Sequence, residues 1–159
     1  HNDIANLIES GRPPTYAPVN IGRARTQGVE TYLAWKPANT LSFRVDYTYT
    51  EAEDTLAHTA LLRRPADKVS IDGLWQATDA LSLDGALLFV GPWNDVGRES
   101  FAPVRQSGTV TADIAADYTL AAGFAVFGRI SNLFDGDNQN PNGFLQPGRG
   151  FYAGLRARL

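Results

Sequence analysis

The last nine residues limit the possible folds more than any other stretch, because apolar and polar side chains alternate strictly along them. One face of an extended strand would carry Phe151, Ala153, Leu155, Ala157 and Leu159. The other face would carry Tyr152, Gly154, Arg156 and Arg158. An apolar face opposite two arginines is typical of a transmembrane β-barrel strand, whose apolar side meets lipid while its polar side faces a wet lumen.

The same period of two recurs along the whole chain. It predicts six further strands, at residues 28–35, 41–49, 69–77, 81–89, 110–118 and 124–130, and a weaker eighth one near 4–8. No segment has the period of an amphipathic helix. The sequence therefore predicts an all-β fold, in which residues 1–159 form one antiparallel transmembrane β-barrel segment of about eight strands.

The lengths of the connections give the segment an orientation. Short connections, such as residues 36–40, 78–80 and 119–123, alternate with long ones at 50–67, 91–108 and 134–148. Outer-membrane barrels have short periplasmic turns and long extracellular loops. We therefore expect the long segments to lie on the extracellular side.

Composition narrows the function. The chain of 159 residues has 14 basic and 17 acidic residues and no cysteine, so it offers no basic surface for nucleic acid and no thiolate chemistry. No apolar run approaches the ~18 residues of a membrane helix. Nucleophile-elbow, zinc-protease and phosphate-loop motifs are absent, which argues against an enzyme, and no cofactor is expected. The acidic groups at 51–54 and 135–137 lack the spacing of a metal-binding loop, so no metal site is predicted.

Two other barrel architectures are compatible with alternation. A soluble ligand-binding barrel turns its apolar face inward, but the abundance of alanine and glycine on the apolar faces suits lipid better than a close-packed core. A self-contained eight-stranded outer-membrane barrel with a structural or adhesive role would need its first strand to pair with its last. The polar interruptions at Asp3, Asn6 and Glu9 argue against such a closing strand.

Three motifs resemble the C-terminal part of TonB-dependent outer-membrane receptors. Gln27-Gly28-Val29-Glu30 opens a strand, the stretch 131–135 (Ser-Asn-Leu-Phe-Asp) closes one, and the stretch 147–159 ends the chain. Their order and spacing also resemble that family over essentially the whole sequence. The Gly143-Phe144 pair ahead of residues 147–149 most resembles the vitamin B12 (cobalamin) receptor branch.

This resemblance implies a transporter. The family barrel has 22 strands and a plugged lumen, so this chain would supply about the last eight strands, without the plug and the N-terminal region that binds TonB. The implied partners are outer-membrane lipid of a bacterium, TonB, the barrel-assembly machinery, and a small-molecule or metal-chelate ligand such as cobalamin or an iron–siderophore complex. The implied assembly signal comprises Tyr152, Gly154, Ala157 and Leu159, although the family usually ends on an aromatic residue.

Two sets of polar residues are candidates for function. Arginines 44, 129, 156 and 158 share the polar faces with acidic residues, and we expect a network of ion pairs on the lumen wall. The long loops combine an aromatic with charged groups, which suits a large ligand with a polar rim. The ligand-binding candidates are Arg63, Arg64, Trp93, Asp95 and Arg98.

Overall fold

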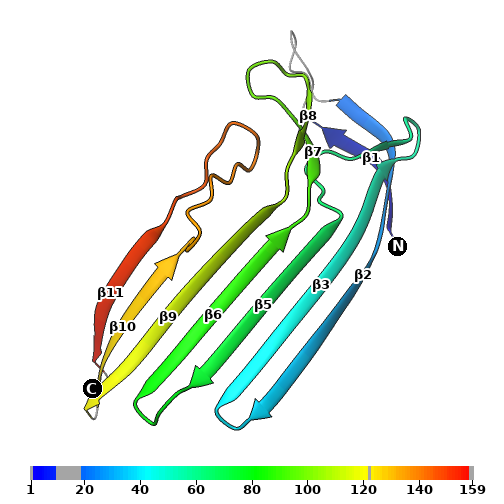
Figure 1. Ribbon diagram of the computed structural model, residues 1–159. Coiled ribbons are helices and arrows are strands. Elements are labelled where there is room, and N and C mark those ends of the chain that lie inside the picture. The colour runs from blue at the N-terminus through cyan, green and yellow to red at the C-terminus, as the bar shows by residue number, and fades with distance from the viewer. Residues whose placement is uncertain (1, 10–18, 122, 158–159) are drawn as a thin grey trace.

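The computed structural model describes residues 2–9, 19–121 and 123–157, which form a curved antiparallel sheet (Figure 1). Its eight long strands are β1 (Asn2–Glu9), β2 (Val19–Ala38), β3 (Leu41–Asp54), β5 (Asp67–Gln76), β6 (Leu81–Val90), β9 (Thr109–Ala121), β10 (Phe124–Ser131) and β11 (Gly150–Ala157). They pair in that order. The short β4 (Thr59–Ala60) pairs with β3, and β7 (Trp93–Val96) pairs with β8 (Pro103–Gln106) as a separate hairpin.

The pairing register collects the apolar residues on one face of the sheet. In one row, which runs from β2 to β9, the directly paired residues are Leu33, Val45, Ile71, Leu87 and Ala112. Because side chains opposite one another in a sheet point to the same side, the alternation of each strand is preserved across the whole sheet. The predicted apolar and polar faces are therefore confirmed as continuous surfaces.

Most of the apolar face is left uncovered by the described part of the chain. Leu155 is 80% exposed and Phe151 71% exposed. Among the described residues the buried apolar side chains are only Ala24, Ala52, Leu61, Trp93 and Ala112. A soluble barrel would bury this face in a close-packed core, whereas a transmembrane barrel presents it to lipid.

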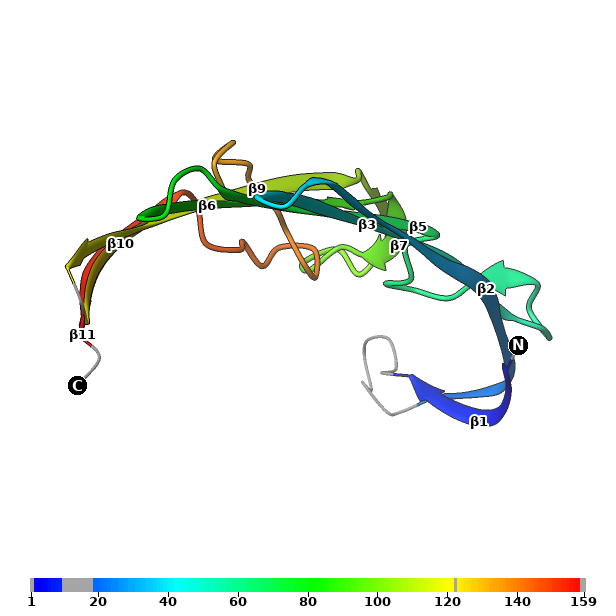
Figure 2. The same cartoon turned by 90° about the horizontal axis from the view of Figure 1, so that it is seen from below.

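The polar face lies on the concave side of the sheet. Figure 2 shows the sheet as an arc, with the segments after β6 and after β10 folded against its concave side. Three ion pairs lie on this face, and they join Arg44 to Asp46, Arg129 to Asp113, and Arg156 to Asp117. The expected pairing of wall charges is thus confirmed for three arginines, while Arg158 lies outside the described residues.

The ends of the sheet differ as the connection lengths predict. The short turns between β2 and β3, β5 and β6, and β9 and β10 lie at one end, while residues 55–66, 91–108 and 132–149 lie at the other (Figure 1). In the part of the chain that the structure describes, no helix is both long and apolar enough to span a membrane.

Three details differ from the predictions. β2 begins at Val19, nine residues before the predicted start, and β3 continues to Asp54 into the segment that we expected to be a loop. The loop 91–108 contains the β7–β8 hairpin, which the sequence did not predict. One prediction is met by contrast: the sheet order leaves β1 and β11 at opposite edges (Figure 2), so the described residues do not show the closure that a self-contained eight-stranded barrel needs.

Candidate functional site

The candidate site lies at the end of the sheet where the long loops gather. Three segments meet there: residues 55–66 after β3, residues 91–108 with the β7–β8 hairpin, and residues 132–149 between β10 and β11. The hairpin is the rigid part of this cluster, because four residue pairs join its strands. Its inward side chains Trp93 and Asp95 are 5% and 0% exposed.

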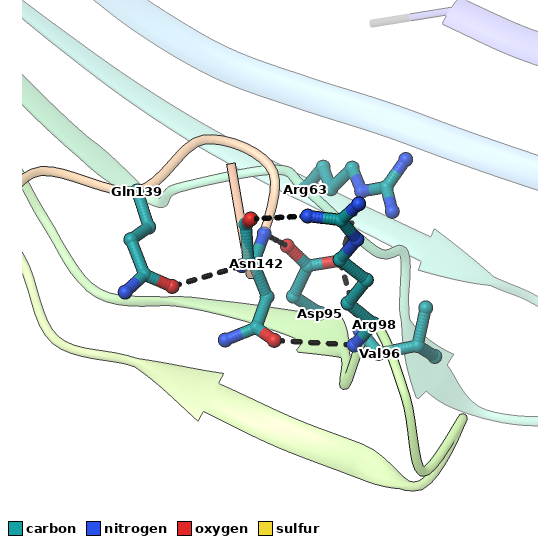
Figure 3. A network of polar contacts seen from close by, with 7 residues as sticks. Arg63, Asp95, Val96, Arg98, Gln139 and Asn142 are labelled. Carbon is teal, nitrogen blue, oxygen red and sulfur yellow. Dashed lines mark hydrogen bonds and ion pairs between the residues drawn. The ribbon is translucent and has the colours of Figure 1, made fainter. Parts of the chain in front are cut away.

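The Asp95 carboxylate joins all three segments (Figure 3). Its Oδ1 accepts hydrogen bonds from Arg63 Nε and from the Val96 backbone N–H, both at 2.8 Å. Its Oδ2 accepts one from the backbone N–H of Asn142, also at 2.8 Å. A fully buried carboxylate is costly unless its charge is paired and its oxygens are hydrogen-bonded, and here both conditions are met.

Electrostatics favour the charged form of this group. Burial by itself would raise the pKa of Asp95. The hydrogen bonds from Asn142, Arg63 and Val96, together with the positive charge of Arg63, outweigh burial and hold the pKa below its ordinary value. Asp95 is therefore an ionised group committed to internal donors, and its contacts fix the three segments relative to one another.

Arg98 forms a second connection to residues 132–149. Its guanidinium Nη1 donates to the carbonyl of Gly143 at 3.1 Å, and its Cζ lies 4.6 Å from the centre of the Phe144 ring. Its backbone N–H donates to Asn142 Oδ1 at 3.3 Å. Gly143 has a φ of +79° and lies so close to Arg98 that an added Cβ would fall 2.7 Å from the arginine side chain, so a side chain there would displace the stacked arginine.

The base of residues 132–149 is held by the motif Ser131-Asn132-Leu133-Phe134-Asp135. Asn132 is buried, and its side-chain amide donates to the carbonyls of Gly136 and Pro147 and accepts from the Gly136 N–H. Asp135 Oδ1 accepts from the backbone N–H of Arg149. These bonds draw the two ends of the loop together, which gives the motif a structural function.

A cavity of about 570 Å³ lies between this loop and the concave face of the sheet. Leu88 on β6, Thr111 and Asp113 on β9, and Arg129 on β10 form part of its floor. Its other lining residues are Val90, Trp93, Thr109, Ser131, Asn132, Asn138, Gln139, Asn140, Gln146, Pro147, Gly148 and Tyr152. The volume falls in the range of roughly 300–1,000 Å³ that small-molecule sites occupy.

The predicted ligand-binding residues take different positions. Arg63 and Asp95 bind each other, and Arg98 binds residues 142–144. Trp93 lines the cavity. Arg64 is exposed and has no hydrogen bond or ion pair within the described part of the chain. The structure therefore brings Arg63, Asp95 and Arg98 into one network, next to Trp93 in the same hairpin, and leaves Arg64 pointing to solvent.

The predicted assembly-signal residues lie on β11, except Leu159, which is outside the described residues. Gly154 is paired with Phe127, and a Cβ added to Gly154 would lie 2.6 Å from the Phe127 ring. A side chain at this position would therefore have to displace the Phe127 ring, which gives the glycine a steric reason. Recognition of Tyr152, Gly154, Ala157 and Leu159 by assembly machinery remains a prediction.

Sequence reasoning missed the contribution of residues 138–148 to the site. Asn142, Gln139 and Gly143 form part of the polar network, in which Gln139 Oε1 accepts from the Gly143 N–H at 2.8 Å (Figure 3). A signal was available in the topology. The short turn between β9 and β10 makes these strands neighbours, so the end of the loop that precedes β9 lies beside the start of the loop that follows β10.

The family model described as "TonB dependent receptor-like, beta-barrel" matches residues 1–133. Three solved structures with the same fold each match 98% of this chain. The ferric enterobactin receptor PfeA from Pseudomonas aeruginosa has a TM-score of 0.75 at 24% identity, and the ferripyoverdine receptor of the outer membrane of the same species has 0.78 at 20%. The copper transporter OprC has a TM-score of 0.78 at 14% identity and 98% coverage.

The chain spans about a quarter of the solved proteins that it matches. It covers 27% of PfeA, 23% of the ferripyoverdine receptor and 26% of OprC. At these identities the likeness establishes the fold, and the ligands of those proteins remain their own.

Proposed function

The chain belongs to the TonB-dependent receptor family, and from this we propose that it forms part of an outer-membrane receptor that imports an iron–siderophore complex with energy delivered through TonB. Proteins of this family are outer-membrane transporters and not enzymes. The barrel segment described above would contribute lumen wall and extracellular loops to the intact receptor.

The observation that carries the proposal is the match to the family barrel over residues 1–133, combined with an apolar face whose exposed side chains extend from β2 to β11. The proteins of similar fold support a metal chelate as the ligand, since two of those named are receptors for ferric complexes and one transports copper. None of these three supports the cobalamin branch, which rests only on the likeness of residues 143–149.

The hydrogen-bond network separates candidate residues that are free to contact ligand from those that hold the loops in place. We propose that the exposed guanidinium of Arg64 and the outer edge of Arg98 contact ligand, with Trp93 in the adjacent cavity wall. Asp95 and Arg63 would act indirectly, by holding the three loops in the geometry that binds. TonB would act on the N-terminal region of the intact receptor, and the barrel-assembly machinery would read the end of β11.

Uptake of ferric siderophore tests this function. Cells that produce the intact receptor are given siderophores labelled with radioactive iron, one class at a time, and accumulation is compared between strains with and without TonB. We expect accumulation that needs both the receptor and TonB. The matched variants Arg64→Ala and Lys36→Ala compare the loss of a cation in a long loop with the loss of a cation at the short-turn end of the sheet. Failure of every iron chelate tested to accumulate, from a receptor present in the outer membrane, would contradict the proposal.

A further inference from the structure

We propose that the cavity beneath residues 132–149 binds an uncharged group rich in hydrogen-bonding atoms, such as the amide backbone of a peptide-like metal chelate or a sugar. The inference rests on the proposed function and names the ligand chemistry of that site. It places the bound group within the cavity, separate from the exposed cationic residues of the loops.

The construction of the cavity points to a binding site. Its floor consists of polar-face residues of β6, β9 and β10, and its cover consists of loop residues 138–140 and 146–148. The floor is rigid, since each of these strands is paired along its length. The cover is fixed at its base by Asn132 and at its tip by Asp95 and Arg98. A preorganised site of this kind loses little conformational entropy on binding.

The charges of the described lining favour an uncharged ligand over a strongly anionic one. Asp113 and Arg129 are the charged residues in the described lining, and they form an ion pair with each other. Asp113 also accepts a hydrogen bond from the backbone N–H of Asn132. The described lining therefore has no uncommitted cation, and an anion bound against it would lose hydration without gaining a partner of opposite charge.

The remaining polar groups are hydroxyls and amides with bonds still to make. Within the described part of the chain, the side chains of six lining residues make no hydrogen bond, namely those of Thr109, Thr111, Ser131, Asn138, Asn140 and Tyr152, although the backbone carbonyl of Asn140 accepts one from Gln146 Nε2. The indole N–H of Trp93, in the same lining, is buried without an acceptor. Hydroxyls and amides both donate and accept hydrogen bonds, so they match a ligand that carries the same groups. The exposed ring of Tyr152 adds an apolar surface for a flat or cyclic part.

Calorimetric titration of the intact receptor in detergent tests the ligand class. Three probes differ in charge and source: a ferric trihydroxamate with a neutral metal centre, the neutral sugar maltotriose, and a ferric tricatecholate with three negative charges. The test variant combines Thr111→Val, Ser131→Ala and Asn138→Leu, which remove cavity hydroxyls and an amide. The control variant combines Thr48→Val and Ser70→Ala, which lie on the same polar face outside the cavity lining.

We expect at least one neutral probe to bind, and the test variant to weaken its binding ten-fold or more while the control variant stays within two-fold of wild type. Binding of the trihydroxamate alone would identify the chelate as the source, and binding of maltotriose would identify a sugar. The proposal is overturned if the tricatecholate alone binds, if no probe binds, or if both variants bind like wild type. TonB-dependent iron uptake, measured with the same variants, tests the proposed function separately. If uptake persists when one of these three binding results is found, the cavity assignment is wrong and the transport function still holds.

Discussion

Arg63 and Asp95 lie 32 residues apart in the sequence, yet Arg63 Nε donates to Asp95 Oδ1 at 2.8 Å. The pair is asymmetric, because the arginine side chain is 49% exposed and the aspartate side chain is 0% exposed. The aspartate therefore depends on its donors, whereas the arginine could be satisfied by water.

Removing the exposed partner should loosen the loops measurably. Arg63→Ala leaves Asp95 with two backbone donors, so we expect loop opening to become easier by about 1 kcal/mol. Hydrogen exchange of residues 94–96 and 142, followed by mass spectrometry on the intact receptor, measures this change. Arg64→Ala is the matched control, since its side chain is exposed and unbonded within the described chain. Equal hydrogen-exchange rates in the two variants would show that the Arg63–Asp95 ion pair does not stabilise the loops.

Acid should release the same contact. The pKa of Asp95 is lower in the folded protein than in the unfolded chain, so its contribution to loop stability is fully present above the unfolded value of ~3.9 and is lost as pH falls through the folded value. We expect Asn142 protection to change little with Asp95 ionisation between pH 7 and about pH 4, and to fall below that.

Asp95→Asn provides the control for this pH dependence. The amide has a similar shape but does not titrate in this range, so the acid-dependent loss should disappear while overall protection drops at neutral pH. If the wild type and Asp95→Asn lost protection along the same pH curve, another group would be responsible.

Two adjacent residues on β9 should differ strongly in the stability that a new positive charge costs. Ile114 lies on the apolar face and Ala115 on the polar face, in the middle of the strand. Ile114→Arg should cost about 2–4 kcal/mol, because a guanidinium would face lipid near the midplane. Ala115→Arg should cost much less, since it faces the wet side, where its direct cross-strand neighbours are Asp84 and Arg129 and the charges of the two offset each other. Unfolding in denaturant with both variants in lipid vesicles measures the difference, and similar costs would contradict the assignment of the faces.

Gly154 allows a structural role to be separated from a recognition signal. Gly154→Val should hinder barrel folding, because the new side chain would overlap the Phe127 ring. Adding Phe127→Ala should restore folding if steric fit is the reason for the glycine. Heat-modifiable migration of the intact receptor on gels reports the folded fraction, and a double variant as defective as Gly154→Val would favour recognition by assembly machinery instead.

The sequence predicted the sheet well and the loop site poorly, for a physical reason. Strands such as 41–49 follow a period of two because each residue faces either lipid or water, and that pattern survives in a single sequence. The Arg63–Asp95 contact follows no period, since it depends on how three loops fold over one another. The hairpin of β7 and β8 escaped notice because four-residue strands are too short for a pattern, and Pro103 argues against a strand.

Because all three loop segments contact Asp95, they cannot be transplanted into another receptor one at a time. A chimera that takes residues 91–108 from this chain, but not residues 63 and 142, would import a desolvated carboxylate and leave its donors behind. Transplanting 132–149 alone would separate Asn142 from its acceptor in the same way. The smallest transferable unit is therefore all three segments together. In natural variants, substitutions at positions 63 and 95 should occur in concert, whereas position 142 contributes its backbone N–H, which any residue except proline supplies.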